Sequence, residues 1–168
     1  MADVITESGM DFVGDNAFYI EKSSLYKKLG NGVKSVEFIR IKGDSLLFIE
    51  AKTTYPNPNN PSAENLTKFH MAIEDTCEKF LHSLNLFSSV KVGVAEFVLS
   101  DDFFALKSAS LVFILVVKNH ELRWCNRIRT SILNSLPLYL KNIWKPIVYV
   151  INHEAAAKRN LVVNYSLL

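Results

Sequence analysis

The chain has 168 residues, of which 49% are hydrophobic and 21% charged, so residues 1–168 can form one domain with a buried core. The longest apolar run, residues 111–117, is too short to span a bilayer, and the acidic N-terminus lacks the pattern of a secretory leader. Cys77 and Cys125 have neither a disulfide framework nor zinc-site spacing. We therefore expect a cytoplasmic protein without membrane association, with both cysteines in its core.

The net charge of +2 is unevenly distributed. Residues 118–168 hold eight Lys or Arg and only two acidic residues, so the preceding part of the chain is net acidic. An acidic part that can hold cations beside a basic part that can hold phosphates suits a protein that acts on nucleic acid. An ordinary solvated surface can have the same asymmetry.

A β-hairpin is the best-defined local structure in the first third of the chain. Residues 36–41 and 46–53 alternate with period two, and the residues at 42–44 form a turn between them. Upstream of this hairpin, the pattern predicts a strand over 17–22 and a short helix over 23–29.

The rest of the chain predicts alternating helices and strands after a loop at 53–65, which holds three prolines and four asparagines. Ser62 is placed to cap a long helix. Residues 86–109 fit either a strand or a helix. The next expected elements are an apolar strand at 111–118, a helix at 121–135, a buried strand at 146–151 and a helix at 153–160. This order describes a mixed α/β fold.

A charged pair ends the second strand of the predicted hairpin. Glu50 and Lys52 must share one face, because side chains two positions apart in a strand point the same way. Glu37, on the first strand, approaches Glu50 if the register aligns the two faces. Two carboxylates beside a lysine can hold a hard divalent ion, which activates water and stabilises charge on a phosphate. The pattern therefore favours phosphodiester chemistry.

The segment SVEFIRIKGDSLLFIEAKTT, residues 35–54, resembles the metal-binding hairpin of the PD-(D/E)xK nuclease superfamily. In that superfamily an acid on one strand precedes an apolar strand that ends in (D/E)-x-K. The resemblance matches Glu37 to the first acid, Glu50 to the second and Lys52 to the lysine. Glu21 would match the additional acid that many members supply from an N-terminal element. It implies a restriction endonuclease-like α/β fold, a mixed β-sheet core flanked by helices.

The resemblance also implies a divalent-metal-dependent nuclease that hydrolyses phosphodiester bonds of DNA with Mg²⁺ or Mn²⁺. Glu37, Glu50 and Glu21 would be metal ligands, and Lys52 would position the attacking water. We expect a lone catalytic domain of this kind to act as a homodimer or with a partner. On one face of the helix predicted at 121–135, Arg123 and Arg127 are candidates for binding a phosphate backbone.

Two other hypotheses fit the same residues. A nuclease fold that has lost catalysis would bind nucleic acid or a protein partner. An unrelated α/β interaction domain would use Glu50 and Lys52 only as an ion pair at a strand end. The sequence also departs from the superfamily pattern, because Glu37 stands where the first acid is usually Asp, and Asp44 in the turn is the alternative first acid.

Overall fold

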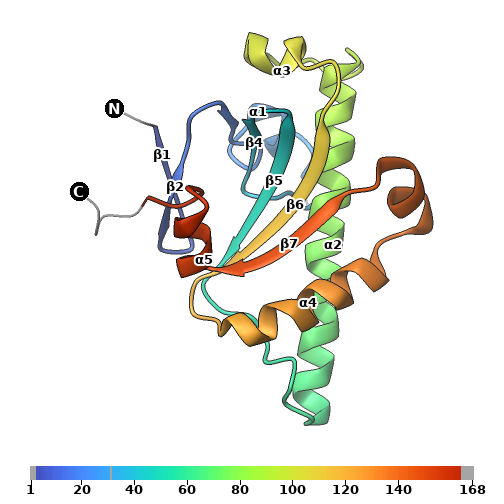
Figure 1. The fold of residues 1–168 in the computed structure, drawn as a ribbon. Helices are drawn as coiled ribbons and strands as arrows, with labels where there is room; N and C mark the ends of the chain where they lie inside the picture. Colours follow the sequence, from blue (N-terminus) through green and yellow to red (C-terminus); the bar gives the residue numbers. More distant parts are fainter. Residues whose placement is uncertain (1–2, 31, 164–168) are drawn as a thin grey trace.

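A five-stranded sheet forms the centre of the computed structural model, which describes residues 3–30 and 32–163 (Figure 1). In spatial order its strands are β3 (Ala17–Phe18), β4 (Phe38–Lys42), β5 (Ser45–Lys52), β6 (Ser110–Val117) and β7 (Ile147–Asn152). The pairs β3–β4 and β4–β5 are antiparallel, and β5–β6 and β6–β7 are parallel. The predicted mixed α/β fold is confirmed, as a single compact domain.

The predicted hairpin is confirmed as β4 and β5. Phe38 pairs with Ile49, and the Glu37 N–H donates to the Ile49 carbonyl oxygen at 3.1 Å. The turn contains Gly43 at a φ of +56°, a conformation that a residue without Cβ adopts at no steric cost. Continuing the register by one residue places Glu37 opposite Glu50, as the metal-site hypothesis required.

Two helices cover one face of the sheet. The long helix α2 (Ala63–Lys91) begins at the predicted cap, Ser62, whose hydroxyl accepts a hydrogen bond from the Asn65 N–H. Helix α4 (Leu122–Ser135) packs beside α2 and against β7. In the core between helix and sheet, Phe80 stacks on Phe113 with ring centroids 4.5 Å apart.

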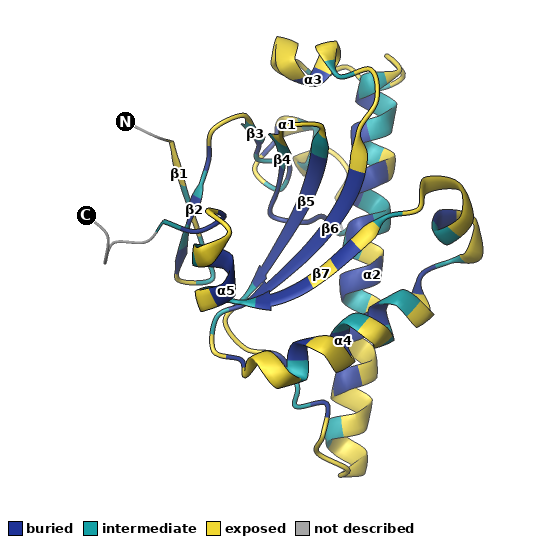
Figure 2. Ribbon diagram, viewed as in Figure 1, coloured by how far each residue is buried: buried dark blue, intermediate teal, exposed yellow. Residues whose placement is uncertain are grey.

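The other face of the sheet is covered only in part (Figure 2). A two-stranded hairpin of β1 (Val4–Glu7) and β2 (Met10–Val13) packs on it together with α5 (His153–Lys158). The sequence had yielded no prediction for this hairpin. None of the helices in the described part of the chain is long and apolar enough to cross a membrane. Both cysteines are buried and free, as expected of core residues.

Several predicted elements differ from the observed ones. The strand expected over 17–22 is shorter than predicted, because only Ala17–Phe18 form strand β3. The chain then turns, with the Ser23 N–H donating to the Ile20 carbonyl oxygen, before α1 (Ser24–Lys27) begins. Between 86 and 109 no strand forms. Helix α2 continues to Lys91, and a short helix α3 spans Asp101–Ala105.

The strand expected at 146–151 is confirmed as β7, but the expectation that it is fully buried was wrong. Strand β7 forms one edge of the sheet, and Ile147 and Tyr149 keep 44% and 43% of their surface exposed. A π-helix, η1 (Leu140–Trp144), precedes it. The continuous apolar run at these positions favours a strand covered on both faces, but the strand order that puts β7 at the edge is a tertiary property.

Candidate functional site

Glu50 lies near the end of β5, on the sheet face that α2 covers, and its side chain is fully buried. The Lys52 ammonium lies 3.1 Å from Glu50 Oε1, so the predicted side-by-side arrangement is confirmed. The Lys79 ammonium, from α2, lies 2.8 Å from the same oxygen. The second oxygen, Oε2, is buried and has no hydrogen-bond partner among the described residues.

Lys79 is an addition that the sequence did not predict. Its side chain is only 14% exposed. Burial lowers the pKa of Lys79, but the charge of Glu50 and the hydrogen bond to it outweigh burial, so the net shift is upward. Burial raises the pKa of Glu50, and the two lysines oppose that rise. We assign the negative charge to Glu50, because two ammonium groups converge on one of its oxygens.

Three other carboxylates gather beside this charged group. Glu7, Glu21 and Glu37 each place one oxygen within 4.8 Å of the other two. Glu37 is buried, whereas the other two are partly exposed, so the cluster opens toward solvent. Two of the predicted metal ligands, Glu21 and Glu37, thus lie together, and Glu7 is a third member of the cluster. Within the described residues, Glu50 is not part of this cluster.

Burial and the neighbouring acids together change the ionisation of Glu37. The pKa of Glu37 is raised to about 9, and burial is the largest cause of the rise. A hydrogen bond to Glu21 and the charge of Glu50 contribute to the same rise, while Lys79 opposes it. At neutral pH Glu37 is thus protonated without a cation. A divalent cation would stabilise its ionised form in place of the proton.

The β1–β2 hairpin carries Glu7 to the cluster. Its tip is a two-residue turn in which Ser8 and Gly9 have φ angles of 51° and 68°. The Ser8 hydroxyl donates to the Ala51 carbonyl oxygen at 3.0 Å, and the Lys118 ammonium donates to the Gly9 carbonyl oxygen at 2.6 Å. These contacts hold the tip against the ends of β5 and β6.

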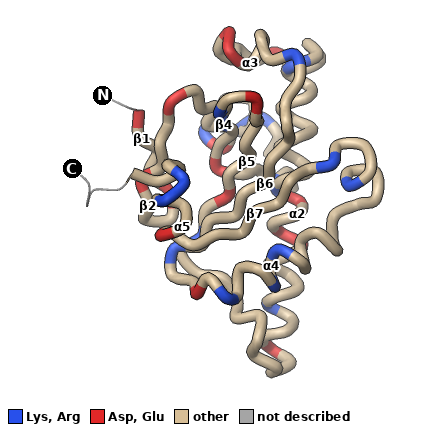
Figure 3. The backbone as a smooth tube through the Cα atoms, in the orientation of Figure 1, with Lys and Arg blue, Asp and Glu red and all other residues tan. Residues whose placement is uncertain are grey.

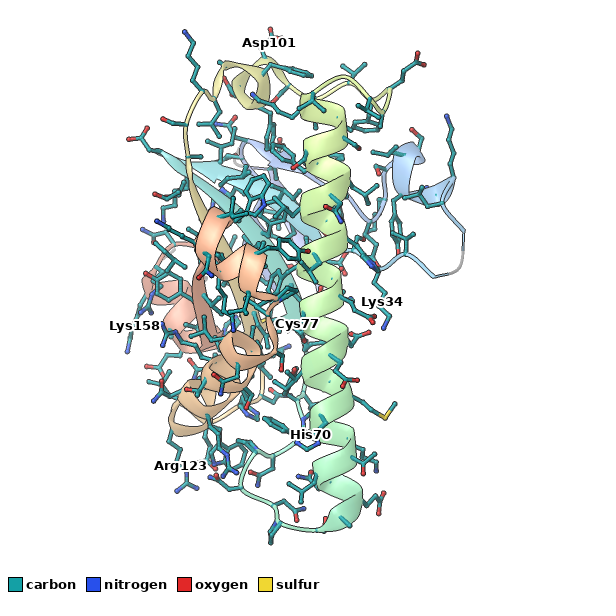
Figure 4. All side chains as sticks on the ribbon, turned by 90° about the vertical axis from the view of Figure 1, so that its right-hand side faces the viewer. Lys34, His70, Cys77, Asp101, Arg123 and Lys158 are labelled. Carbon is teal, nitrogen blue, oxygen red and sulfur yellow. The ribbon has the colours of Figure 1, made fainter. Side chains whose placement is uncertain are left out.

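The two arginines proposed to bind phosphate do not reach the carboxylates. Arg123 pairs with Glu121 at 2.6 Å, and Arg127 donates to the Asn59 side chain at 2.9 Å. Figure 4 shows Arg123 across α2 from Lys34, which precedes Glu37 in the chain. The alternative first acid, Asp44, is exposed in the turn at the far end of β5 from Glu50.

Different signals were available for the residues that the sequence reasoning missed. Glu7 is followed directly by Ser8-Gly9, which is a hairpin-turn signal. Lys79 carried no comparable signal, since it lies on the border of the buried face of α2. Its role depends on where α2 crosses the sheet, which is a tertiary property.

The arrangement combines hard oxygen donors with ammonium groups at one end of the sheet. The three clustered glutamates are donors of the kind that hard divalent cations prefer, and Lys52 and Lys79 are fixed positive charges on the neighbouring Glu50. Figure 3 shows acidic residues around the N-terminal hairpin and β4–β5, and basic residues on α4 and before β7. Comparison with family models, curated proteins and solved structures found no match to this chain.

Proposed function

We propose that the protein is a divalent-metal-dependent nuclease of the PD-(D/E)xK type that hydrolyses phosphodiester bonds of DNA. The observation that carries this proposal is Glu50 Oε2, a fully buried carboxylate oxygen that has no hydrogen-bond partner in the part of the chain that the structure describes. Leaving such an atom unsatisfied costs free energy, and proteins keep it where a ligand completes the site. Lys52 and Lys79 occupy only the other oxygen.

Mg²⁺ or Mn²⁺ fits the donor set. The donors are carboxylate oxygens, the ligands that hard divalent cations prefer. Glu7, Glu21 and Glu37 already lie within reach of a shared ion, and we assign Glu50 Oε2 as a further ligand. A bound ion would supply Lewis acidity, lowering the pKa of a water and stabilising charge on the phosphate.

The residues of the chain take separate roles in this proposal. Lys52, which is 34% exposed, faces solvent enough to meet a phosphate and to orient the attacking water. Lys79 is more deeply buried, and it positions Glu50 rather than touching substrate. A cytoplasmic location, which two free cysteines favour, and action as a homodimer or with a partner belong to the same proposal.

A plasmid-nicking assay tests the proposal. Purified protein should nick supercoiled DNA with Mg²⁺ or Mn²⁺ and lose this activity with EDTA. Lys52→Ala should abolish nicking while the circular dichroism spectrum stays unchanged. The matched control is Lys107→Ala, an exposed lysine on the loop before β6, which should keep full activity. Nicking that survives Lys52→Ala would come from another site or a contaminant.

A second candidate function is binding of nucleic acid without cleavage. It is favoured by the two ammonium groups on Glu50 Oε1, because they compensate the buried charge in the absence of a cation. Under this alternative the protein would bind DNA with steep salt dependence and leave it uncut with either metal. The nicking assay and a binding assay on the same preparation separate the two functions.

A further inference from the structure

Two adjoining hollows open around Tyr149, on the part of the sheet that the N-terminal hairpin and α5 leave bare. One has a volume of about 520 Å³ and lies over β5, β6 and β7. The other, of about 310 Å³, lies between α4, β7 and α5. Tyr149, Ile151 and Arg159 line both. Because the Tyr149 side chain is 43% exposed, it presents an aromatic surface between the hollows. We call this pair of hollows the Tyr149 groove.

Three cations line the Tyr149 groove, and each is held only by neutral oxygens. The Lys42 ammonium donates to the Arg159 carbonyl oxygen at 2.8 Å, and Arg129 Nε donates to the Val148 carbonyl oxygen at 2.7 Å. Arg159 Nη1 donates to the Ala155 carbonyl oxygen at 3.1 Å. Within residues 3–30 and 32–163, none of the three cations forms an ion pair with a carboxylate. No described carboxylate thus compensates their charge.

The sequence around the groove contains a long stretch without acidic residues. No Asp or Glu occurs between Glu121 and Glu154, while five Lys or Arg do. The described residues that line the two hollows also include no acid. An anionic ligand in the groove therefore meets three cations and no acid among the described lining residues.

The contacts along the edge of the sheet argue against a peptide that adds a strand to β7. Arg129 already occupies the Val148 carbonyl oxygen, which a sixth strand would need for its backbone pairing. A second copy of this chain would bring the same cations face to face across a two-fold axis, which is unfavourable. A polyanion with flat rings meets neither obstacle.

We infer that the Tyr149 groove binds single-stranded nucleic acid, with a base against Tyr149 and phosphates on Arg159, Lys42 and Arg129. Two hollows that share one wall suit successive nucleotides of a strand rather than one small molecule. Stacking on an exposed aromatic ring and cations along a groove are the features that proteins use for single strands. Because Glu50 points to the opposite face of the sheet, the groove is a separate surface, and the inference does not depend on the proposed cleavage.

Fluorescence anisotropy with a labelled dT20 oligonucleotide tests the inference, with the full chain in EDTA so that cleavage cannot contribute. Tyr149→Ser should weaken binding by about tenfold or more, the loss expected for one stacked base. Arg159→Gln should reduce the slope of log affinity against log salt by roughly 0.7, the value for one phosphate contact on a single strand. Tyr139→Ser is the matched control, because Tyr139 is 53% exposed and lies outside the groove.

Four outcomes would overturn the inference. The first is the absence of dT20 binding by the wild-type protein, and the second is an equal loss of affinity in Tyr139→Ser and Tyr149→Ser. The third is equal affinity for dT20 and for an abasic oligonucleotide, which would show that only the phosphate charge is bound and that no base stacks on Tyr149. The fourth is displacement of dT20 by thymidine monophosphate at the same nucleotide concentration, which would indicate a single-nucleotide site. Unchanged melting temperatures of the variants ensure that each loss reports on binding.

Discussion

Lys79 and Glu50 are 29 positions apart in the chain, yet the Lys79 ammonium donates to Glu50 Oε1 at 2.8 Å. The contact joins the middle of α2 to the end of β5, and Glu50 is fully buried. Lys52, the lysine predicted from the sequence, contacts the same Glu50 oxygen from the strand itself. Among the described residues, the second oxygen of Glu50 has no hydrogen-bond partner, and it is the atom that we propose as a metal ligand.

Removing the Lys79 ammonium should destabilise the protein strongly. We expect Lys79→Met to lower the free energy of unfolding by about 3 kcal/mol, because it leaves the buried Glu50 with one partially exposed partner. Urea denaturation measures this change. Lys68→Met, which breaks the exposed pair with Glu64, should show no measurable effect. A Lys79→Met, Glu50→Gln double variant should recover part of the loss, and a purely additive loss would argue against direct coupling.

Divalent cations should stabilise the folded protein through the carboxylate cluster. At a Ca²⁺ concentration of about 100 times the Kd, the gain should be about 2.7 kcal/mol, because a ligand that binds only the native state shifts the unfolding equilibrium. Differential scanning fluorimetry should show a higher Tm for the wild type and a smaller shift for Glu37→Gln. Glu64→Gln removes an exposed acid outside the cluster and should keep the full shift. An unchanged wild-type Tm would contradict the metal site.

The metal-free protein should lose stability as pH rises toward 9. The pKa of Glu37 is raised from 4.5 to about 9 in the folded state, so the folded protein binds a proton that the unfolded chain releases. The stability that protonated Glu37 contributes is fully present below its unfolded pKa of 4.5, and it is lost as the pH rises through its folded pKa of about 9. Urea unfolding in EDTA between pH 6 and pH 9 should show a decline that Glu37→Gln flattens. The same decline in both proteins would show that Glu37 does not titrate in this range.

The hairpin tip should matter for cation binding. Gly9→Ala and Gly43→Ala each place a Cβ at positive φ, at a cost of about 1 kcal/mol. Only Gly9 lies in the turn that carries Glu7, and its Cβ would come within 2.9 Å of Lys118 Nζ. We therefore expect only Gly9→Ala to reduce the Ca²⁺-dependent rise in Tm. Equal Ca²⁺-dependent rises in Tm in the two variants would show that the hairpin tip does not contribute to cation binding.

Much of the fold could be predicted because its strongest signals are local. The hairpin of β4 and β5, the cap at Ser62 and the apolar strand β6 follow from side-chain alternation, helix periodicity and turn chemistry, which act over a few residues. The shared face of Glu50 and Lys52 is local in the same sense, because strand geometry alone dictates it.

Only the tertiary structure decided what surrounds that pair. Glu7 reaches the cluster because the tip of the β1–β2 hairpin lies against the ends of β5 and β6, and Lys79 reaches Glu50 because α2 crosses β5 at one particular turn. Neither contact is encoded in a local pattern, since each depends on how whole layers pack. For the same reason the exposure of Tyr149 could not be predicted. Strand β7 has the continuous apolar run of a buried strand, and its edge position follows from the strand order. The sequence by itself determined the acid and lysine at the strand end, and the packing of layers determined their partners.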